Sequence, residues 1–214
     1  MIRAFVFDFD GLILDTESAL IDSYAAVHAR HGQAFERAIF LQSVGHADYA
    51  FDPWHVFEKR ADRAALEAER RAYNRELDQT LPILPGVIAL LEAAGAARLR
   101  LGVASNSGHV HVEGHLKRLG LHRHFEFFAC REDAAAPKPA PDLYRLVLRH
   151  FGLTGAEAVA FEDSQTGIAA AKGAGLWAVA VANSSTAHHD FSRADLRAAS
   201  LADVRLPDLQ TRFD

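Results

Sequence analysis

Cysteine, lysine and long apolar runs are all scarce in this chain of 214 residues. Cys130 is the one cysteine, so no disulfide can form within the chain, which is typical of a reducing compartment. No stretch approaches the roughly 18 apolar residues of a membrane-spanning helix. The apolar run at residues 4–7 is too short for the core of a signal peptide. We therefore expect a cytoplasmic protein without a membrane partner.

An excess of positive charge is also missing. The formal net charge is -5, and a mildly acidic chain lacks the basic surface that binds nucleic acid, so we expect no nucleic-acid partner. Half of the residues are hydrophobic and 24% are charged, which is usual for a globular protein. The length suits one domain with a smaller insert. The composition leaves open whether the protein is a monomer or a small homo-oligomer.

What the chain does contain is a series of short apolar runs that are typical of buried strands. They lack polar alternation, which suits a parallel sheet covered on both faces. Helical patterns lie between them, and several end at a glycine. Alternating strands and helices predict an α/β fold with a doubly wound, mostly parallel sheet. The expected strands are residues 4–7, 99–104, 125–129, 158–161 and 178–182, and the expected helices are residues 87–94, 110–119, 141–151 and 168–174.

One interval breaks this alternation. Residues 16–80 contain no clear strand, only helical patterns at residues 18–30 and 60–77. An insert of roughly 65 residues is far longer than a connection between a strand and a helix requires. We interpret residues 16–80 as a helical cap domain, inserted after the first strand of a core domain made of residues 1–15 and 81–214. Ligands of open α/β sheets bind at the carboxyl ends of the strands, and a cap would cover that edge.

Asp8 and Asp10 form the first of four polar groups that follow predicted strands. A carboxylate at a strand end can attack an electrophile or bind a cation. A second carboxylate two residues later can act as general acid and base. Gly11 allows a sharp turn and lets a ligand approach the backbone. Alone, an Asp-X-Asp sequence is also compatible with a solvated turn or with a cation site of another enzyme class.

The other three groups also have ordinary structural explanations when each is taken alone. Ser105 and Asn106 precede a predicted helix, where they can seat an oxyanion or simply cap the helix. Lys138 lies between two prolines and can neutralise a phosphoryl oxygen or lie in a surface loop. Glu162 and Asp163 end a strand, where they can bind Mg²⁺ or favour a helix N-terminus. Together, the four groups converge on one edge of the sheet and supply what phosphoryl transfer needs.

The content and order of these motifs resemble the haloacid dehalogenase superfamily, in the branch of β-phosphoglucomutase-like phosphatases with a helical cap. The resemblance covers nearly the whole chain, and its combination of motifs is highly specific. The matching segments are residues 8–17, which read DFDGLILDTE, the Ser105-Asn106 strand end, residues 138–142 and residues 162–164.

The resemblance implies a phosphatase that works through an aspartyl-phosphate intermediate. Asp8 would be the nucleophile, Asp10 the general acid and base, and Lys138 would steady the charge. The cofactor would be Mg²⁺, which screens negative charge as the nucleophile approaches the phosphate. Its ligands would be the Asp8 carboxylate, the Asp10 backbone carbonyl and Asp163, with Glu162 as a further ligand.

The implied partner is a small-molecule phosphate ester, such as a sugar phosphate. Ser105 and Asn106 would bind its phosphoryl group. His46 and Trp54 are candidates for cap residues that face the substrate, although ordinary packing within the cap explains them equally well.

Three other functions are compatible with parts of the sequence. A β-phosphoglucomutase-like phosphosugar mutase is the main alternative, but Leu20 stands where the mutases have a cap histidine, and residues 44–48 lack their arginine. A phosphonatase would need an activated cap lysine, whereas Lys59 lies in a charged sequence. A non-catalytic binding module would be expected to have lost part of the catalytic set, and none of that set is missing.

Two histidine pairs have simpler interpretations. His111 and His115 have the spacing of a metal-binding pair on a helix, but no glutamate follows His111 as it does in zinc proteases. We interpret this pair as part of a solvated helix face. His188 and His189 are expected in a loop.

Overall fold

The computed structural model describes residues 1–43, 51–57 and 62–213, which divide into two compact units. The core unit comprises Met1–Leu14 and Ile83–Asp214, and the inserted unit comprises Asp15–Pro82. These bounds lie close to the predicted domain boundaries. The role of the inserted unit as a cap stays a prediction.

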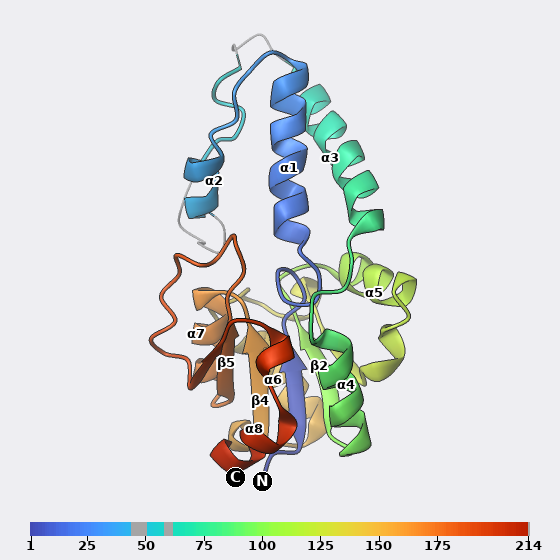
Figure 1. The fold of residues 1–214 in the computed structure, drawn as a ribbon, viewed down its shortest axis with the longest axis vertical. Coiled ribbons are helices and arrows are strands. Elements are labelled where there is room, and N and C mark those ends of the chain that lie inside the picture. Colours follow the sequence, from blue (N-terminus) through green and yellow to red (C-terminus); the bar gives the residue numbers. More distant parts are fainter. Residues whose placement is uncertain (44–50, 58–61, 214) are drawn as a thin grey trace. The chain divides into compact units, whose positions relative to one another are not determined.

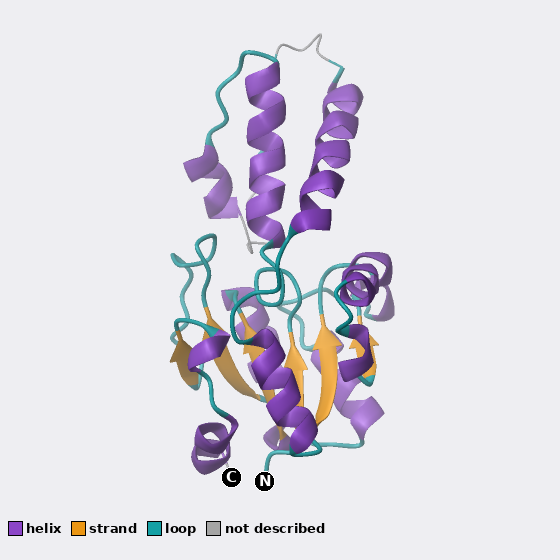
Figure 2. Cartoon of the chain, turned by 45° about the vertical axis from the view of Figure 1, so that its right-hand side comes forward, coloured by secondary structure: helices purple, strands orange, loops and turns teal. Residues whose placement is uncertain are grey.

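A parallel sheet lies at the centre of the core unit (Figures 1 and 2). In the described residues it has six strands in the order β3-β2-β1-β4-β5-β6, and every neighbouring pair is parallel. This order confirms the predicted doubly wound α/β fold. The strands are β1 (Ala4–Phe7), β2 (Arg100–Ala104), β3 (Phe127–Ala129), β4 (Ala158–Glu162), β5 (Trp177–Val181) and β6 (Leu196–Ala198).

Helices cover both faces of the sheet (Figure 2). Because successive side chains of a strand point to opposite faces, β1 contributes to two separate packing layers. Ala4 and Val6 pack with buried residues of α6 and α7. Phe5 and Phe7 contact Phe161, and the rings of Phe7 and Phe161 are stacked with their centroids 4.8 Å apart. The helices of the core unit are α4 (Val87–Ala96), α5 (His109–Arg118), α6 (Asp142–Phe151), α7 (Gln165–Gly173) and α8 (Leu206–Phe213).

Burial on both faces explains why the strands read as continuous apolar runs. All four residues of β1 are fully buried, and β4 is buried along its whole length. The carboxyl ends of β1, β2 and β4 lie at the same edge of the sheet because the strands are parallel. Single-turn 3-10 helices complete the core unit at His122–His124, Arg131–Asp133, Gly155–Glu157 and Leu201–Asp203.

The core unit has one point where the chain leaves for the insert and returns. Leu14 forms an isolated antiparallel bridge with Ile83, and the backbone N–H of Leu84 donates to the carbonyl of Ile13 at 2.9 Å. The last residue before the insert and the first residue after it are therefore paired neighbours in the core unit.

The described part of the inserted unit is helical, as predicted. Its helices are α1 (Thr16–Arg30), α2 (Arg37–Ser43) and α3 (Arg63–Thr80). The α3 helix begins three residues later than expected, because the Asp62 side chain accepts hydrogen bonds from the N–H groups of Ala64 and Ala65 and so marks the helix start. No helix in the described residues is long and apolar enough to cross a membrane.

Trp54 belongs to the interior of the inserted unit. Its ring stacks on His28 with the centroids 5.2 Å apart, and it packs with Val27 and Leu66. Of the two interpretations of Trp54, packing within the insert is the one that the structure supports. His46, the other candidate for a cap residue that faces the substrate, and Lys59, the lysine of the insert, lie outside the described residues.

Candidate active site

Asp8 follows the last residue of β1 and is largely buried. Its backbone N–H donates to the carbonyl of Phe161 at 3.0 Å, which fixes it to the neighbouring β4. Burial raises the pKa of the Asp8 carboxyl to about 8, because its effect outweighs the lowering by the adjacent Lys138 ammonium. A carboxylate in this setting gains stability as an anion from any further positive charge nearby.

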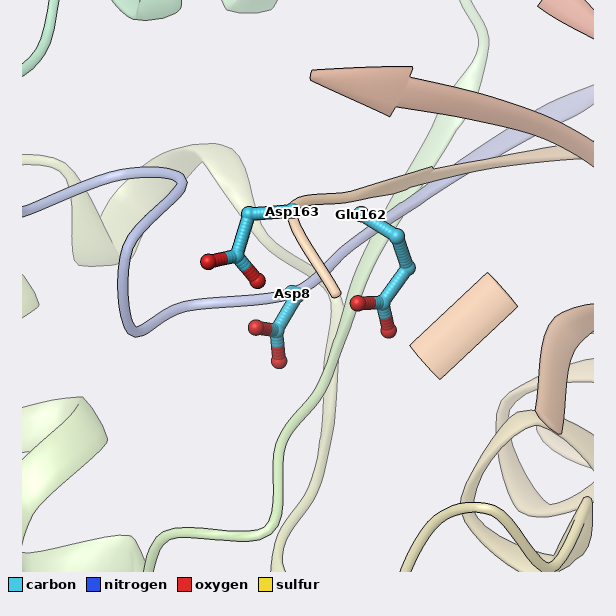
Figure 3. Close-up of side chains that lie close together, drawn as sticks. All are labelled: Asp8, Glu162 and Asp163. Carbon is cyan, nitrogen blue, oxygen red and sulfur yellow. The ribbon is translucent and has the colours of Figure 1, made fainter. Parts of the chain in front are cut away.

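Three carboxyl groups lie together at the ends of β1 and β4 (Figure 3). Asp8, Glu162 and Asp163 each offer one oxygen, and these oxygens all lie within 4.8 Å of one another. All three residues are buried. Hard, closely spaced oxygen atoms are the ligands that Mg²⁺ prefers, so the cluster fits the predicted cation site.

Lys138 places an ammonium group between two of these carboxylates. Its Nζ lies 2.7 Å from Asp8 Oδ1 and 2.6 Å from Glu162 Oε1. Burial alone would lower the pKa of Lys138, but the Asp8 and Glu162 carboxylates outweigh it and raise the pKa above the ordinary value. Tyr144 also donates its hydroxyl to Glu162 Oε1. Lys138 is therefore a fixed cation. Its single positive charge offsets only part of the negative charge that the three carboxyl groups of the cluster carry when they are ionised.

Asn106 connects this lysine to the end of β2. The Asn106 side chain accepts a hydrogen bond from the Lys138 N–H at 2.8 Å and donates one to the Lys138 carbonyl at 3.4 Å. Ser105 is buried, and its Oγ accepts from the Ser107 N–H at 3.0 Å. Neither side chain caps α5, whose N-cap is Gly108 without a side-chain hydrogen bond. The capping alternative is therefore wrong for this pair, and phosphoryl binding stays a prediction.

Gly11 leaves space for the acidic cluster. Its φ of +72° is in the left-handed region, and a Cβ there would lie 2.3 Å from Asp163 Oδ2 and 2.5 Å from Asn183 Nδ2. The Asn183 amide donates to Asp163 Oδ2 at 2.8 Å and to the Gly11 carbonyl at 3.0 Å. Asn183 thus holds Asp163 in place.

Asn183 is not among the residues that the sequence motifs indicate. It follows β5 at the same edge of the sheet, so the strand-end rule that found the other groups could have found it.

Asp10 points its carboxylate toward the start of α5. Its Oδ2 accepts from Ser107 Oγ at 2.6 Å, and its Oδ1 lies 2.9 Å from His111 Nε2. This carboxylate is not part of the three-residue acidic cluster that the described residues form. The predicted metal contact of Asp10 is through its backbone carbonyl, and it stays a prediction.

The interpretation of His111 and His115 as a solvated face is wrong. His115 is buried, and His111 is half-buried and bonded to Asp10. The physical reason is Phe9, which lies in the turn after β1 and packs against both imidazole rings. Burial, followed by the charges of His111 and Arg118, lowers the pKa of His115. His188 and His189 lie in the loop between β5 and β6, as predicted.

Comparisons with known proteins agree with this geometry. A family model described as haloacid dehalogenase-like hydrolase matches residues 5–181. The chain is 37% identical over 213 residues to a protein of Bacillus subtilis (strain 168) named as a candidate phosphatase, YhcW, and the match covers 96% of this chain and 95% of that protein. It is 28% identical over 185 residues to the phosphorylated carbohydrates phosphatase of Thermotoga maritima, with 81% of this chain and 82% of the other covered.

A solved structure resembles the chain over its whole length. The structure is a mutant of CbbY from Rhodobacter sphaeroides in complex with xylulose-(1,5)bisphosphate. The TM-score is 0.77 at 27% sequence identity, and the similarity covers 100% of both chains.

Proposed function

The chain belongs to the haloacid dehalogenase-like hydrolases, and we propose that it is a Mg²⁺-dependent phosphatase that acts on a small phosphorylated metabolite through an aspartyl-phosphate. The observation that carries this proposal is the buried Asp8 carboxylate, which lies beside the Lys138 ammonium and shares an acidic cluster with Asp163. A nucleophile, a fixed cation and a set of metal ligands then lie within one small volume.

The donor set suits Mg²⁺ because it consists of closely spaced oxygen atoms. Asp8, Asp163 and the backbone carbonyl of Asp10 would hold the ion. When bound, Mg²⁺ supplies positive charge that lets an anionic carboxylate approach an anionic phosphate. Glu162 Oε1 already accepts from Lys138 and Tyr144, so we assign Glu162 first to holding Lys138 and only second to binding metal.

In the first half of the reaction, an Asp8 carboxylate oxygen attacks phosphorus while the bond from phosphorus to the ester oxygen breaks. Asp10 donates a proton to that leaving oxygen, so the alcohol departs neutral. Lys138 offsets the charge that develops on the nucleophile and the phosphoryl oxygens. Ser105 and Asn106, at the end of β2, would bind the phosphoryl group.

In the second half, water attacks the phosphorus of the aspartyl-phosphate, and Asp10 takes up its proton. The bond between phosphorus and the Asp8 oxygen breaks, which releases inorganic phosphate and restores the Asp8 carboxylate. One residue thus serves as acid and then as base, as the two directions of proton transfer require.

The names of two relatives support a proposal for the substrate class. The Thermotoga maritima relative is named for phosphorylated carbohydrates, and the CbbY structure holds a sugar bisphosphate. We therefore propose a sugar phosphate or a similar small ester as the substrate.

The replacement Asp8→Asn tests the proposal. It removes the nucleophilic oxygen while keeping the size of the side chain. With Mg²⁺ and p-nitrophenyl phosphate, kcat should fall by at least about 10³-fold while the circular dichroism spectrum is retained. The control Asp208→Asn makes the same chemical change at an exposed position of α8 and should keep full activity. An Asp8→Asn enzyme with kcat within tenfold of the parent would overturn the nucleophile assignment.

The reaction product distinguishes the proposed phosphatase from the alternative, a phosphosugar mutase. β-Glucose 1-phosphate is supplied together with a trace of glucose bisphosphate, and the products are followed over time. A phosphatase releases glucose and inorganic phosphate. Glucose 6-phosphate as the main product would replace hydrolysis with phosphoryl transfer between two positions of the sugar.

A further inference from the structure

Each oxygen of the Asp10 carboxyl group lies within hydrogen-bonding distance of a side chain at the start of α5. Ser107 lies directly before the N-cap Gly108 of α5, and His111 lies in the first turn. The Ser107 hydroxyl is 2.6 Å from Asp10 Oδ2, and His111 Nε2 is 2.9 Å from Asp10 Oδ1. With its hydrogen on Nε2, His111 is a donor to Asp10.

The His111 ring is itself held in a defined orientation. It meets the fully buried Phe9 ring edge-on at 90°, with the centroids 5.5 Å apart. It also meets the His115 ring at 73°, with the centroids 4.8 Å apart. Contacts with two other rings restrict rotation of the His111 side chain, which keeps its Nε2 directed at Asp10.

We propose that His111 is a positioning residue for the leaving-group step: it fixes the Asp10 carboxyl group where that group can transfer a proton to the ester oxygen. The inference rests on the proposed function, in which Asp10 is the general acid. Asp8 and Lys138 lie in a separate set of contacts, so His111 acts on proton transfer and not on nucleophilic attack. Proton transfer efficiency depends on the geometry between acid and acceptor, and a loosened carboxyl group would lose it.

The proposal makes a prediction that a merely structural role does not. An ester with a poor leaving group needs the proton of Asp10, whereas p-nitrophenolate departs with little help. Loss of His111 should therefore slow the cleavage of phenyl phosphate more than that of p-nitrophenyl phosphate. The quantity to compare is kcat/KM, because it covers only the steps up to departure of the leaving group.

The variants differ in whether they keep a donor. His111→Ala and His111→Leu both remove the N–H donor. His111→Leu keeps more of the side-chain volume that packs against Phe9. Each should lower kcat/KM for phenyl phosphate by about 10- to 50-fold and for p-nitrophenyl phosphate by less than about threefold. His111→Gln keeps an N–H and should bring the phenyl phosphate value to within about threefold of the parent. His109→Ala, on the same helix, should leave the ratio of the two values unchanged.

Equal losses on the two esters, no loss on either, or a His111→Gln enzyme no better than His111→Ala would overturn the proposal. Asp8→Asn is measured alongside. If Asp8→Asn keeps its turnover, the proposed function itself fails. If Asp8→Asn is inactive while the ester ratio of the His111 variants matches that of the parent, only the inference on His111 fails.

Discussion

At the scale of single residues, Gly11 is a position where the backbone lies close to the acidic cluster. We expect Gly11→Ala to destabilise the fold by about 1–2 kcal/mol, because its φ of +72° disfavours a Cβ. The new Cβ would also displace Asp163 Oδ2, so Mg²⁺ affinity should fall by at least about tenfold. Thermal unfolding and calorimetric titration with Mg²⁺ measure the two effects.

Gly120 provides the matched control for this prediction. Its φ is +71°, but nothing lies within 4 Å of the position where its Cβ would be. Gly120→Ala should therefore carry the backbone strain without the loss of Mg²⁺ affinity. If both variants bound Mg²⁺ as the parent does, the contact between Gly11 and Asp163 would have no part in cation binding.

The sequence gives some site residues more readily than others. Asp8 and Asp163 can be predicted because they directly follow strands, so a correct strand assignment is enough to find them. Lys138 can be predicted because it lies between two prolines. His111 is wrongly assigned to a solvated face because its role depends on one hydrogen bond to Asp10, which is 101 positions away in the chain. Spacing along a helix shows which residues share a face, but not which loop packs on that face.

At the scale of elements, two helical glycines of the core unit should respond to alanine in opposite ways. Gly114 lies inside α5 with open space at its Cβ position, so Gly114→Ala should stabilise the protein by about 0.5–1 kcal/mol through lower unfolded-state entropy. Gly167 lies in the first turn of α7, and its Cβ would lie 1.8 Å from Glu162 Oε2. Because Lys138 holds that carboxylate, Gly167→Ala should destabilise the protein by about 2 kcal/mol or more.

Chemical denaturation of both variants measures these changes in the free energy of unfolding. The Gly114→Ala variant serves as the control for helix propensity, since it makes the same substitution without the collision. A Gly167→Ala protein as stable as Gly114→Ala would mean that Glu162 can leave Lys138 at little cost.

The elements that the sequence predicts best are those buried on both faces. β1 and β4 read as unbroken apolar runs because no part of them meets solvent. β6 is missed because its three residues, Leu196–Ala198, are only partly buried and include an exposed arginine. α8 lies in a polar tail, and its buried residues are Leu209 and Phe213. Two apolar positions are too few to show the periodicity that predicts a helix.

At the scale of the whole molecule, Cys130 reports on whether the core unit is intact. Its side chain is fully buried, and burial raises the pKa of its thiol to about 12. A raised pKa keeps the thiol neutral at pH 8, so native protein should react with Ellman's reagent far more slowly than protein unfolded in guanidinium chloride. The unfolded sample at the same pH is the control, and one thiol per chain should react there. Rapid reaction of the native protein would show that this region opens readily.

The bridge between Leu14 and Ile83 has an evolutionary consequence. Since departure and return of the chain are adjacent, a gene could lose, lengthen or exchange the codons for residues 15–82 without shifting the pairing of β1 with β2. Recombination at that junction would give descendants a different inserted unit while the strand order of the core unit stayed the same.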